Sequence, residues 1–378
     1  IFYYYFALVT LAGLAVDAVK RWAWVSALAL IFAFVAAWAL YAGGGGSENL
    51  LGFALIVTAG AVTIPRREIC PTHDGAMSWE FVRNRLDTAV RWPEFPTRLA
   101  AGAFGGAAAS AAWIGLRDPG LAESWMVITT LSILYLAASL WFVRAPALSD
   151  LAVLPAVLFL AVIVALAREN ASLYGLFQFG MARAPETAPP PAVTILVLLA
   201  LIGSALAMWR TLWGGPYAQV WAAGAALLAP LALILVEIFW QPALVLGDGR
   251  WATHAVVIAA AMAYFGERVA RRDGEDKRRV AYFALSALTM ISFAFIVILS
   301  QAALTLALAV MVVGAAMLDR RLNLPLLTLF VQAGVVVIGW RLVINPGIVW
   351  GYYAEFWEAM LAYIGAAVLL GVALFALA

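Results

Sequence analysis

Long stretches with few charged residues are the feature of this sequence that most limits what it can fold into. Apolar residues make up 66% of its 378 residues and charged residues only 12%, whereas soluble globular domains are roughly half apolar and about one quarter charged. Lipid is therefore the solvent to which this chain is suited. A bilayer core about 30 Å thick takes about 20 apolar residues in a helix, so stretches near that length are candidate spans.

Thirteen candidate spans can be marked along the chain. We expect each to be a helix because a helix satisfies its backbone polar groups within the segment, and the runs lack the alternating polar residues of a membrane barrel. The sequence thus predicts an all-α, polytopic transmembrane helix bundle of about thirteen spans, forming a single transmembrane domain over residues 1–378. The candidate spans are Ile1–Val19, Trp22–Ala42, Leu50–Ile64, Thr97–Leu116, Trp125–Val143, Leu151–Ala167, Pro191–Trp209, Tyr217–Trp240, Trp251–Phe265, Val280–Leu299, Gln301–Leu318, Leu322–Trp340 and Trp357–Ala378.

Lysine and arginine are distributed unevenly between the connections of these spans. Connections after odd-numbered spans hold 18 of the 23 basic residues, and connections after even-numbered spans hold the other 5. Basic residues accumulate in cytoplasmic connections. We therefore expect the odd connections to be cytoplasmic and residue 1 to lie on the periplasmic side of a bacterial inner membrane.

Two features of the apolar runs affect the span count. Val280–Leu318 contains 39 residues without a turn signal, and one helix of that length would be roughly 58 Å long, nearly twice the hydrocarbon thickness. We therefore expect a tight hairpin near Ser300 and Gln301. The chain also begins and ends inside apolar sequence, at Ile1 and Ala378, so we expect it to be a fragment of a longer protein.

The largest polar insertion is Pro65–Pro96, on the predicted cytoplasmic side. Apolar residues spaced three and four apart predict an amphipathic helix over Ala76–Trp92 that lies in the lipid headgroup layer. That helix is either a docking surface for a partner or a surface segment that joins two spans. A second charged stretch, Glu267–Arg279, mixes both signs and is interpreted as a solvated cytoplasmic turn that fixes topology.

The fourth span carries small residues at intervals of four, namely Gly102, Gly106 and Ser110. Small residues on one face allow helix backbones to approach closely in lipid. This face is expected to pack against another helix of the chain or against a partner membrane protein.

Candidate binding residues lie in the predicted outer connections. Glu237 interrupts the apolar run at the end of the eighth span, and His254 and Arg341 belong to outer segments that follow. Ionisable residues within spans are costly and are therefore functional candidates. If the connections are adjacent, the three residues could bind an anionic or proton-coupled substrate. The alternative is that Glu237 pairs with an arginine or reaches the interface.

Aromatic residues are concentrated on the same predicted outer side. They indicate an interfacial aromatic belt, with a sugar-stacking or lipid-headgroup site as the alternative. The residues are Trp240, Trp251, Trp350, Tyr352, Tyr353, Phe356 and Trp357.

Motifs for metal, cofactor or catalysis are lacking in the sequence. Cys70 and His73 are the only thiol and imidazole near Asp74, whereas a zinc site normally has four ligands. The phosphate loop, the H-E-x-x-H pair and the nucleophile elbow are absent. We therefore assign no metal, no cofactor and no catalytic residue. A net charge of +2 gives no basic surplus for nucleic acid, so the expected partner is the lipid bilayer.

Two segments carry a resemblance to a known family. The run from Phe2 to Thr10, followed by Lys20-Arg21-Trp22-Ala23-Trp24, resembles a helix pair of a bacterial family of very long membrane proteins that is catalogued only as a domain of unknown function. The stretches Leu318–Pro325 and Trp340–Pro346 look similar to its C-terminal part. The resemblance implies a longer chain with more spans, and it implies no activity and no site residues.

Three functions are consistent with these features. The first is non-enzymatic transport or handling of a small molecule or lipid, across or within the inner membrane, at Glu237, His254 or Arg341. The second is a scaffold or assembly subunit that docks a partner through the fourth span or the Ala76–Trp92 helix. The third is a membrane-embedded transferase, which would need paired acidic or histidine residues in an outer cleft. Scarce charge within the spans argues against ion-coupled pumping.

Overall fold

The fold is described from a computed structural model. It covers residues 1–20, 22–70, 72–73, 95–117, 119–168, 172–182, 188–214, 217–274, 276–299, 301–322, 327–344 and 347–377. Every element in this part of the chain is helical, which confirms the all-α class. The contacts divide the chain into two compact units: unit 1 is Ile1–Ala192 with Ile238–Trp240, and unit 2 is Val193–Glu237 with Gln241–Ala378. The expectation of a single transmembrane domain stays a prediction.

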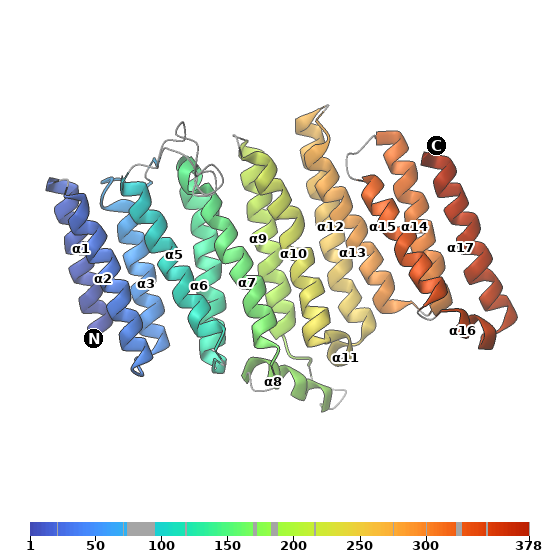
Figure 1. The fold of residues 1–378 in the computed structure, drawn as a ribbon, viewed down its shortest axis with the longest axis horizontal. Helices are drawn as coiled ribbons and strands as arrows, with labels where there is room; N and C mark the ends of the chain where they lie inside the picture. Colours follow the sequence, from blue (N-terminus) through green and yellow to red (C-terminus); the bar gives the residue numbers. More distant parts are fainter. Residues whose placement is uncertain are drawn as a thin grey trace. The chain divides into compact units, whose positions relative to one another are not determined.

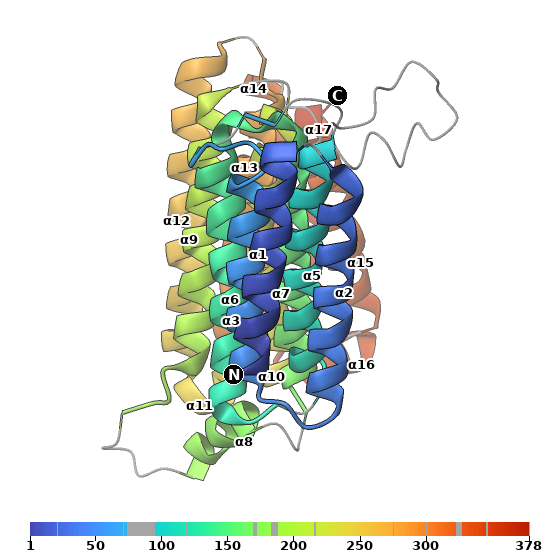
Figure 2. The same cartoon turned by 90° about the vertical axis from the view of Figure 1, so that its left-hand side faces the viewer.

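Unit 1 is a bundle of long helices in which successive members run in opposite directions (Figures 1 and 2). Its centre is the packing of α3 on α5, with α6 and α7 against α5 and with α1 and α2 beside α3. The fully buried rings of Phe53 and Phe104 come from α3 and α5. The elements are α1 (Phe2–Lys20), α2 (Ala23–Ala42), α3 (Ser47–Thr63), α5 (Phe95–Gly115), α6 (Leu121–Leu140), η1 (Trp141–Arg144), η2 (Pro146–Ala152), α7 (Val153–Leu166), α8 (Ser172–Gln178) and η3 (Phe179–Ala182).

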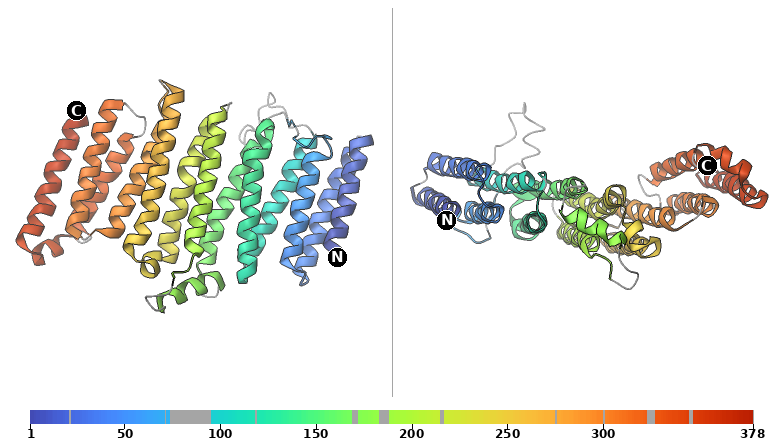
Figure 3. Two further views of the ribbon diagram at one scale, coloured as in Figure 1. Left: turned by 180° about the vertical axis from the view of Figure 1, so that it is seen from behind. Right: turned by 90° about the horizontal axis from the view of Figure 1, so that it is seen from below.

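Unit 2 has the same up-and-down arrangement. The α12–α13 pair has the most extensive packing, and α14 packs against both α15 and α17, which lie together when the structure is viewed from below (Figure 3). The elements are α9 (Ala192–Trp213), α10 (Ala218–Trp240), α11 (Pro242–Leu246), α12 (Asp248–Asp273), α13 (Arg278–Ile298), α14 (Gln301–Leu322), α15 (Leu327–Val343), α16 (Gly347–Tyr353) and α17 (Phe356–Leu377). The last three residues of α10 belong to unit 1.

The described helices make the chain a multi-pass membrane protein. Nine helical segments are long and apolar enough to cross a membrane, and the bent pair α15 and α16, with 53° between its two parts, would be a tenth. The nine segments are Phe2–Lys20, Ala23–Ala42, Leu121–Arg144, Pro146–Leu166, Ala192–Trp213, Ala218–Trp240, Arg278–Ile298, Ala303–Arg320 and Phe356–Phe375.

Each of the thirteen predicted ranges coincides with a described helix, but thirteen crossings are not confirmed. Three of the ranges correspond to α3, α5 and α12, which are not among the nine segments or the bent pair. Helix α3 has 17 residues, and α5 is rich in alanine and glycine and is surrounded by neighbouring helices. Helix α12 carries charged residues in both its first and last turns. The short helix α3 and the interior helix α5 need less lipid-facing apolar surface than an isolated span, and α12 extends its charged ends beyond its apolar part.

The expected hairpin within Val280–Leu318 is confirmed. Helix α13 ends at Ile298, Leu299 has an extended conformation, and α14 begins at Gln301. The Glu267–Arg279 stretch differs from its prediction as a solvated turn, because α12 continues to Asp273. Alternating charge signs do not interrupt a helix when acid and base lie four residues apart, as Glu267 and Arg271 do in their ion pair. The helix stops at Gly274, whose φ of 58° suits a glycine beyond a helix end.

The predicted amphipathic helix Ala76–Trp92 lies outside the described residues. His73 belongs to the described part of the Pro65–Pro96 insertion, and Thr97 is the residue just after the insertion. These two side chains share a hydrogen bond of 2.9 Å between Nδ1 and Oγ1. That contact fixes the segment that follows α3 to the first turn of α5.

Basic residues separate to one end within each unit, as the sequence predicts. In unit 1 the end with most basic residues, called the arginine-rich end, is formed by the ends of α1 and α3 and the start of α5 (Figure 1). It carries Lys20, Arg66, Arg67, Arg98 and Arg144. Arg117 and Arg168 lie at the other end, called the arginine-poor end. In unit 2 the arginine-rich end includes the end of α9 and the α12–α13 connection, with Arg210, Arg268, Arg271, Arg272, Lys277, Arg278, Arg279 and Arg320. Arg250 and Arg341 lie at its arginine-poor end.

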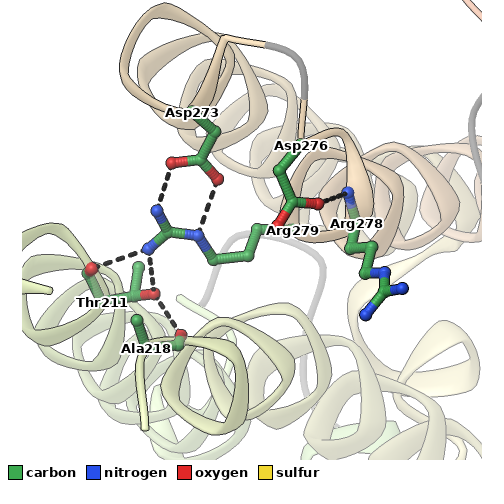
Figure 4. A network of polar contacts seen from close by, with 6 residues as sticks. All are labelled: Thr211, Ala218, Asp273, Asp276, Arg278 and Arg279. Atoms are coloured by element: carbon green, nitrogen blue, oxygen red, sulfur yellow. Dashed lines mark hydrogen bonds and ion pairs between the residues drawn. The ribbon is translucent and has the colours of Figure 1, made fainter. Parts of the chain in front are cut away.

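A polar network joins two hairpins at the arginine-rich end of unit 2 (Figure 4). The Arg279 guanidinium forms a two-point ion pair with Asp273, in which Nε lies 2.7 Å from Oδ2. Its Nη1 also donates to the backbone oxygen of Thr211 at 2.8 Å and to its hydroxyl at 3.0 Å, and Thr211 donates to the Ala218 carbonyl. The side chains of Asp273 and Arg279 are 5% and 12% exposed. The network therefore holds the α12–α13 connection against the α9–α10 connection.

The small-residue face of α5 packs within the chain, against α2. A Cβ on Gly106 would lie 2.7–3.0 Å from the ring of Phe34, and one on Gly102 would lie 3.8 Å from Leu30. Ser110 accepts a hydrogen bond of 2.9 Å from the Trp38 indole. Leu30, Phe34 and Trp38 repeat every four residues, matching the spacing on α5, so the two faces interlock.

Replacing Gly106 by alanine tests this close approach. We expect Gly106→Ala to lower the free energy of unfolding by about 1–3 kcal/mol, because overpacking forces a buried neighbour to shift. Sodium dodecyl sulfate titration in mixed micelles measures this value. Gly105→Ala is the matched control, because a Cβ there meets nothing within 4 Å. Equal stability of the two variants would contradict the proposed α2–α5 contact.

Candidate functional site

The candidate site lies at the arginine-poor end of unit 2, where α10 turns into α12. Gln241 ends α10 in the left-handed region (φ 50°, ψ 54°), α11 begins at Pro242, and Gly247 has a φ of 85°. Two residues with positive φ and a proline at the first helical position make the connection tight. The last turn of α10 is thereby placed against the first turn of α12.

Glu237 and Trp251 face one another across this turn. Glu237 is half-buried, its carboxyl lies beside the indole of Trp251, and Asp248 is a second acidic neighbour. Trp251 is fully buried. Oε2 of Glu237 and Nε1 of Trp251 are both buried and interact with each other, but neither makes a hydrogen bond of normal length and angle with a described residue. A buried acceptor and a buried donor are thus available at one place, which is uncommon in folded proteins.

His254 lies next to Trp251 but has partners for both ring nitrogens. The two rings are 5.1 Å apart between centroids. Nδ1 lies 3.0 Å from the Arg250 carbonyl, and Nε2 lies 3.0 Å from the Thr194 hydroxyl. A carbonyl can only accept, so Nδ1 carries the proton and Nε2 can accept from Thr194. His254 therefore joins α9 to α12 and supports Trp251 from one side.

Arg341 belongs to a different part of unit 2. It lies in the last turn of α15, at the arginine-poor end, while α12 and α13 stand between α10 and α15 in Figure 1. The turn after α15 is held to α17 by Tyr363, whose hydroxyl lies 3.1 Å from the Leu342 carbonyl and 3.0 Å from the Gly347 carbonyl. The three-residue site predicted from the sequence stays a prediction, with two of its members placed around Trp251.

The predicted aromatic belt is wrong for two of its members. Trp240 and Trp251 are fully buried, whereas Tyr352, Tyr353, Phe356 and Trp357 are 82%, 80%, 71% and 66% exposed, as a belt requires. Trp240 packs in unit 1, where its indole donates to the Ile163 carbonyl at 2.9 Å. Spacing alone cannot separate these groups, because a tryptophan that precedes a turn can face either lipid or the adjacent helix.

Metal ligation has no cluster of residues to support it within the described segments. No group of three histidine, cysteine, aspartate or glutamate side chains lies close enough there to hold an ion. His73 is buried and contacts Thr97 and the Val62 carbonyl, at 2.9 and 3.4 Å. Cys70 is exposed, and Asp74 lies outside the described residues.

Sequence reasoning placed Trp251 in an aromatic belt, with a sugar-stacking or lipid-headgroup site as the alternative, and it did not find Thr194. Asp248 lies in the first turn of α12, and nothing in its spacing marks it as a neighbour of Glu237. Thr194 is in the first turn of α9, far from His254 in sequence, and a threonine in an apolar run gives no signal by itself. The tertiary packing of α9 on α12 is the information that was needed.

Comparisons with protein-family models, with curated proteins and with solved structures find no match for this chain. The resemblance to the family of very long bacterial membrane proteins therefore stays a prediction.

Stability measurements can separate a binding role of Glu237 from a structural one. We expect Glu237→Gln to leave the free energy of unfolding unchanged or to raise it by up to about 1 kcal/mol, because an unpartnered buried carboxylate stabilises nothing. His254→Ala should lower it by about 1–3 kcal/mol, because two hydrogen bonds and a ring contact are lost.

The same dodecyl sulfate titration measures both variants. Thr253→Ala is the matched control for His254, because Thr253 is exposed and bonds only to the Gly249 carbonyl one turn earlier. A loss of more than about 1 kcal/mol in Glu237→Gln would show that the carboxylate serves the fold.

Proposed function

We propose that this protein handles a small molecule or lipid within a bacterial inner membrane, without catalysing a reaction, and that Glu237 and Trp251 hold the polar group of that ligand. The observation that supports this is a pair of buried atoms at one turn, the carboxylate Oε2 and the indole Nε1, which interact with each other but make no hydrogen bond of normal geometry with a described residue. An ionised carboxylate only accepts hydrogen bonds and an indole N–H only donates. A hydroxyl group can satisfy both, and an ammonium group with an adjacent oxygen can do the same.

The chemistry of the site favours a ligand that is not an anion. Glu237 and Asp248 are neighbours, so two carboxylates would repel a negative group placed between α10 and α12. His254 already has partners on both ring nitrogens. We therefore replace the anionic substrate considered from the sequence by a neutral or cationic polar group on an otherwise apolar molecule.

The alternatives have less support. A transferase needs an acid and a base, or a nucleophile and a base, in mutual contact, and His254 contacts Trp251, Thr194 and a carbonyl instead. A scaffold would need an unoccupied docking surface, whereas the small-residue face of α5 is covered by α2. The remaining scaffold candidate, Ala76–Trp92, lies outside the described residues.

Ligand retention by the purified full chain tests the proposal. The probe is the total lipid extract of the membrane in which the protein is produced, incubated with the protein in detergent and then removed by exchange. Mass spectrometry should find a species retained in roughly equimolar amount by the wild type. We expect that amount to fall by about tenfold or more in Glu237→Gln, because one charge-assisted hydrogen bond is worth about 1.5–3 kcal/mol.

Glu358→Gln is the matched control, because Glu358 is an exposed carboxylate in the first turn of α17, at the same arginine-poor end. It should retain the ligand at the wild-type level. The proposal fails if no species is retained, or if Glu237→Gln and Glu358→Gln retain the same amount as the wild type.

The proposed orientation places the arginine-rich end of each unit in the cytoplasm. Cys70 is the only cysteine and is exposed at that end of unit 1. We expect a membrane-impermeant maleimide to label it only after the cells are permeabilised. In a Cys70→Ser background, Gly249→Cys introduces an exposed thiol at the arginine-poor end of unit 2, where a Cβ meets nothing within 4 Å. That thiol should react in intact cells, and the reverse labelling pattern would invert the topology.

A further inference from the structure

A basic pocket lies at the arginine-rich end of unit 2. Its volume is about 350 Å³ and it is lined by Leu212, Arg268, Arg271 and Arg272. Pockets of about 300–1,000 Å³ are the size that small ligands and headgroups occupy. The side chains that line it come from the ends of two helices, α9 and α12, so the pocket belongs to the tertiary fold and not to one helix alone.

Two of its arginines have no anionic partner among the residues that the structure describes. Arg271 pairs with Glu267 on the preceding turn, and both side chains remain largely exposed, at 70% and 55%. Within the described residues no hydrogen bond or ion pair engages Arg268 or Arg272. These two are four residues apart on the same helix face, where like charges repel. An anion in the pocket would remove that repulsion and would be met by three guanidinium groups.

The geometry of the pocket is fixed by its surroundings. The Asp273–Arg279–Thr211 network holds the end of α12 to the end of α9 (Figure 4). Arg272 reaches across to α9, since its Nη2 lies 3.9 Å from where a side chain on Gly214 would begin. Binding therefore need not order the helices that form the pocket.

The position of the pocket is that of a lipid headgroup. Trp209 and Trp213 contact each other at the end of α9 with their rings tilted by 54° and the centroids 5.5 Å apart, and Trp213 is 58% exposed. Exposed tryptophan at the end of an apolar helix marks the headgroup level of the membrane. Basic pockets between transmembrane helices on the cytoplasmic side bind anionic headgroups.

From these observations we infer that the pocket formed by Leu212, Arg268, Arg271 and Arg272 binds the phosphate of an anionic phospholipid. Guanidinium groups match phosphate oxygens in geometry and charge, and Leu212 gives the first apolar contact for the glycerol and chain atoms. This site lies at the opposite end of unit 2 from Glu237 and does not depend on the function proposed for that residue.

Native mass spectrometry of the full chain in detergent tests the inference. Short-chain phosphatidylglycerol should bind at least about fivefold more tightly than phosphatidylcholine with the same chains, since each basic residue near the surface contributes about 1 kcal/mol toward an anionic lipid. Arg268→Gln with Arg272→Gln should weaken phosphatidylglycerol binding by at least about tenfold and leave phosphatidylcholine unchanged. Arg268→Lys with Arg272→Lys keeps the charge and should retain most of the affinity.

Arg278→Gln is the matched control. Arg278 is exposed in the same connection, does not line the pocket, and points away from Thr211 in Figure 4. It should change the affinity by less than about twofold. The double glutamine variant should unfold at the wild-type detergent concentration without added lipid, because neither side chain has a hydrogen bond or ion pair to a described residue.

Inorganic phosphate separates the two sources of the ligand. Arginine-dependent binding of phosphatidylglycerol supports the lipid assignment, whether or not inorganic phosphate competes. Arginine-dependent binding of inorganic phosphate alone overturns that assignment and leaves a soluble phosphate compound as the ligand. Equal binding of the two lipids, unchanged binding in the double glutamine variant, or an equal loss in Arg278→Gln overturns the inference as a whole.

Discussion

The constraint on which this structure depends is that lipid offers no hydrogen bonds, so each polar group among the helices must find its partner in the protein. The described polar side chains show how this is done. Threonine and serine hydroxyls return to the carbonyl four residues earlier, as Thr10 and Ser132 do at 2.7 and 2.8 Å. Others connect helices, as Thr58 on α3 does with the Ala103 carbonyl of α5 at 3.0 Å. A buried polar atom that departs from this rule is a candidate for contact with a ligand.

Close helix contact follows from the same constraint, because dispersion and hydrogen bonding replace the hydrophobic effect between helices in lipid. The α2–α5 contact combines both. Gly106 lets the Phe34 ring approach the backbone of α5, and the Trp38 indole then reaches Ser110 at 2.9 Å. In unit 2, Ser204 plays a comparable role, since its hydroxyl accepts from the Ala229 amide at 3.1 Å. That amide lies immediately before Pro230, in the interior of α10.

The sequence predicted the individual helices well, but it did not predict which helices pack against each other. Apolar length predicted every long helix because a membrane helix needs no information from its neighbours. The break after Ile298 followed from length alone, and the separation of basic residues to one end of each unit followed from the positive-inside rule. Tertiary facts were not accessible in this way. The burial of Trp251, the Thr194 hydrogen bond to His254 and the position of Arg341 on α15 all depend on which helices are neighbours, and one sequence does not state that.

The length of α12 shows that the sequence rules for membrane spans can also end a helix too early. Charge in Glu267–Asp273 indicated a turn, because charge is expensive in hydrocarbon. A helix that extends beyond the bilayer is not subject to that cost, and the Glu267–Arg271 pair and the arginines of its last turn favour the helical state. Sequence rules for membrane spans therefore locate the apolar part of a helix, while its true end is set by local helix chemistry, here by Gly274.

The two ends of unit 2 differ in the charge that the fold leaves uncompensated. At the arginine-poor end a carboxylate oxygen of Glu237 is buried without a hydrogen bond of normal geometry to a described residue, and at the arginine-rich end no described acid pairs with Arg268 or Arg272, which line one pocket. Neither feature stabilises the folded chain by itself, since an unpartnered buried charge costs free energy and neighbouring cations repel. Nearby groups show that pairing was available, because Asp273 and Arg279 are joined at two points a few residues away. We explain the uncompensated charge at each end of unit 2 by a bound ligand. The ligand at Glu237 would donate a hydrogen bond, and the ligand at the arginines would be an anion.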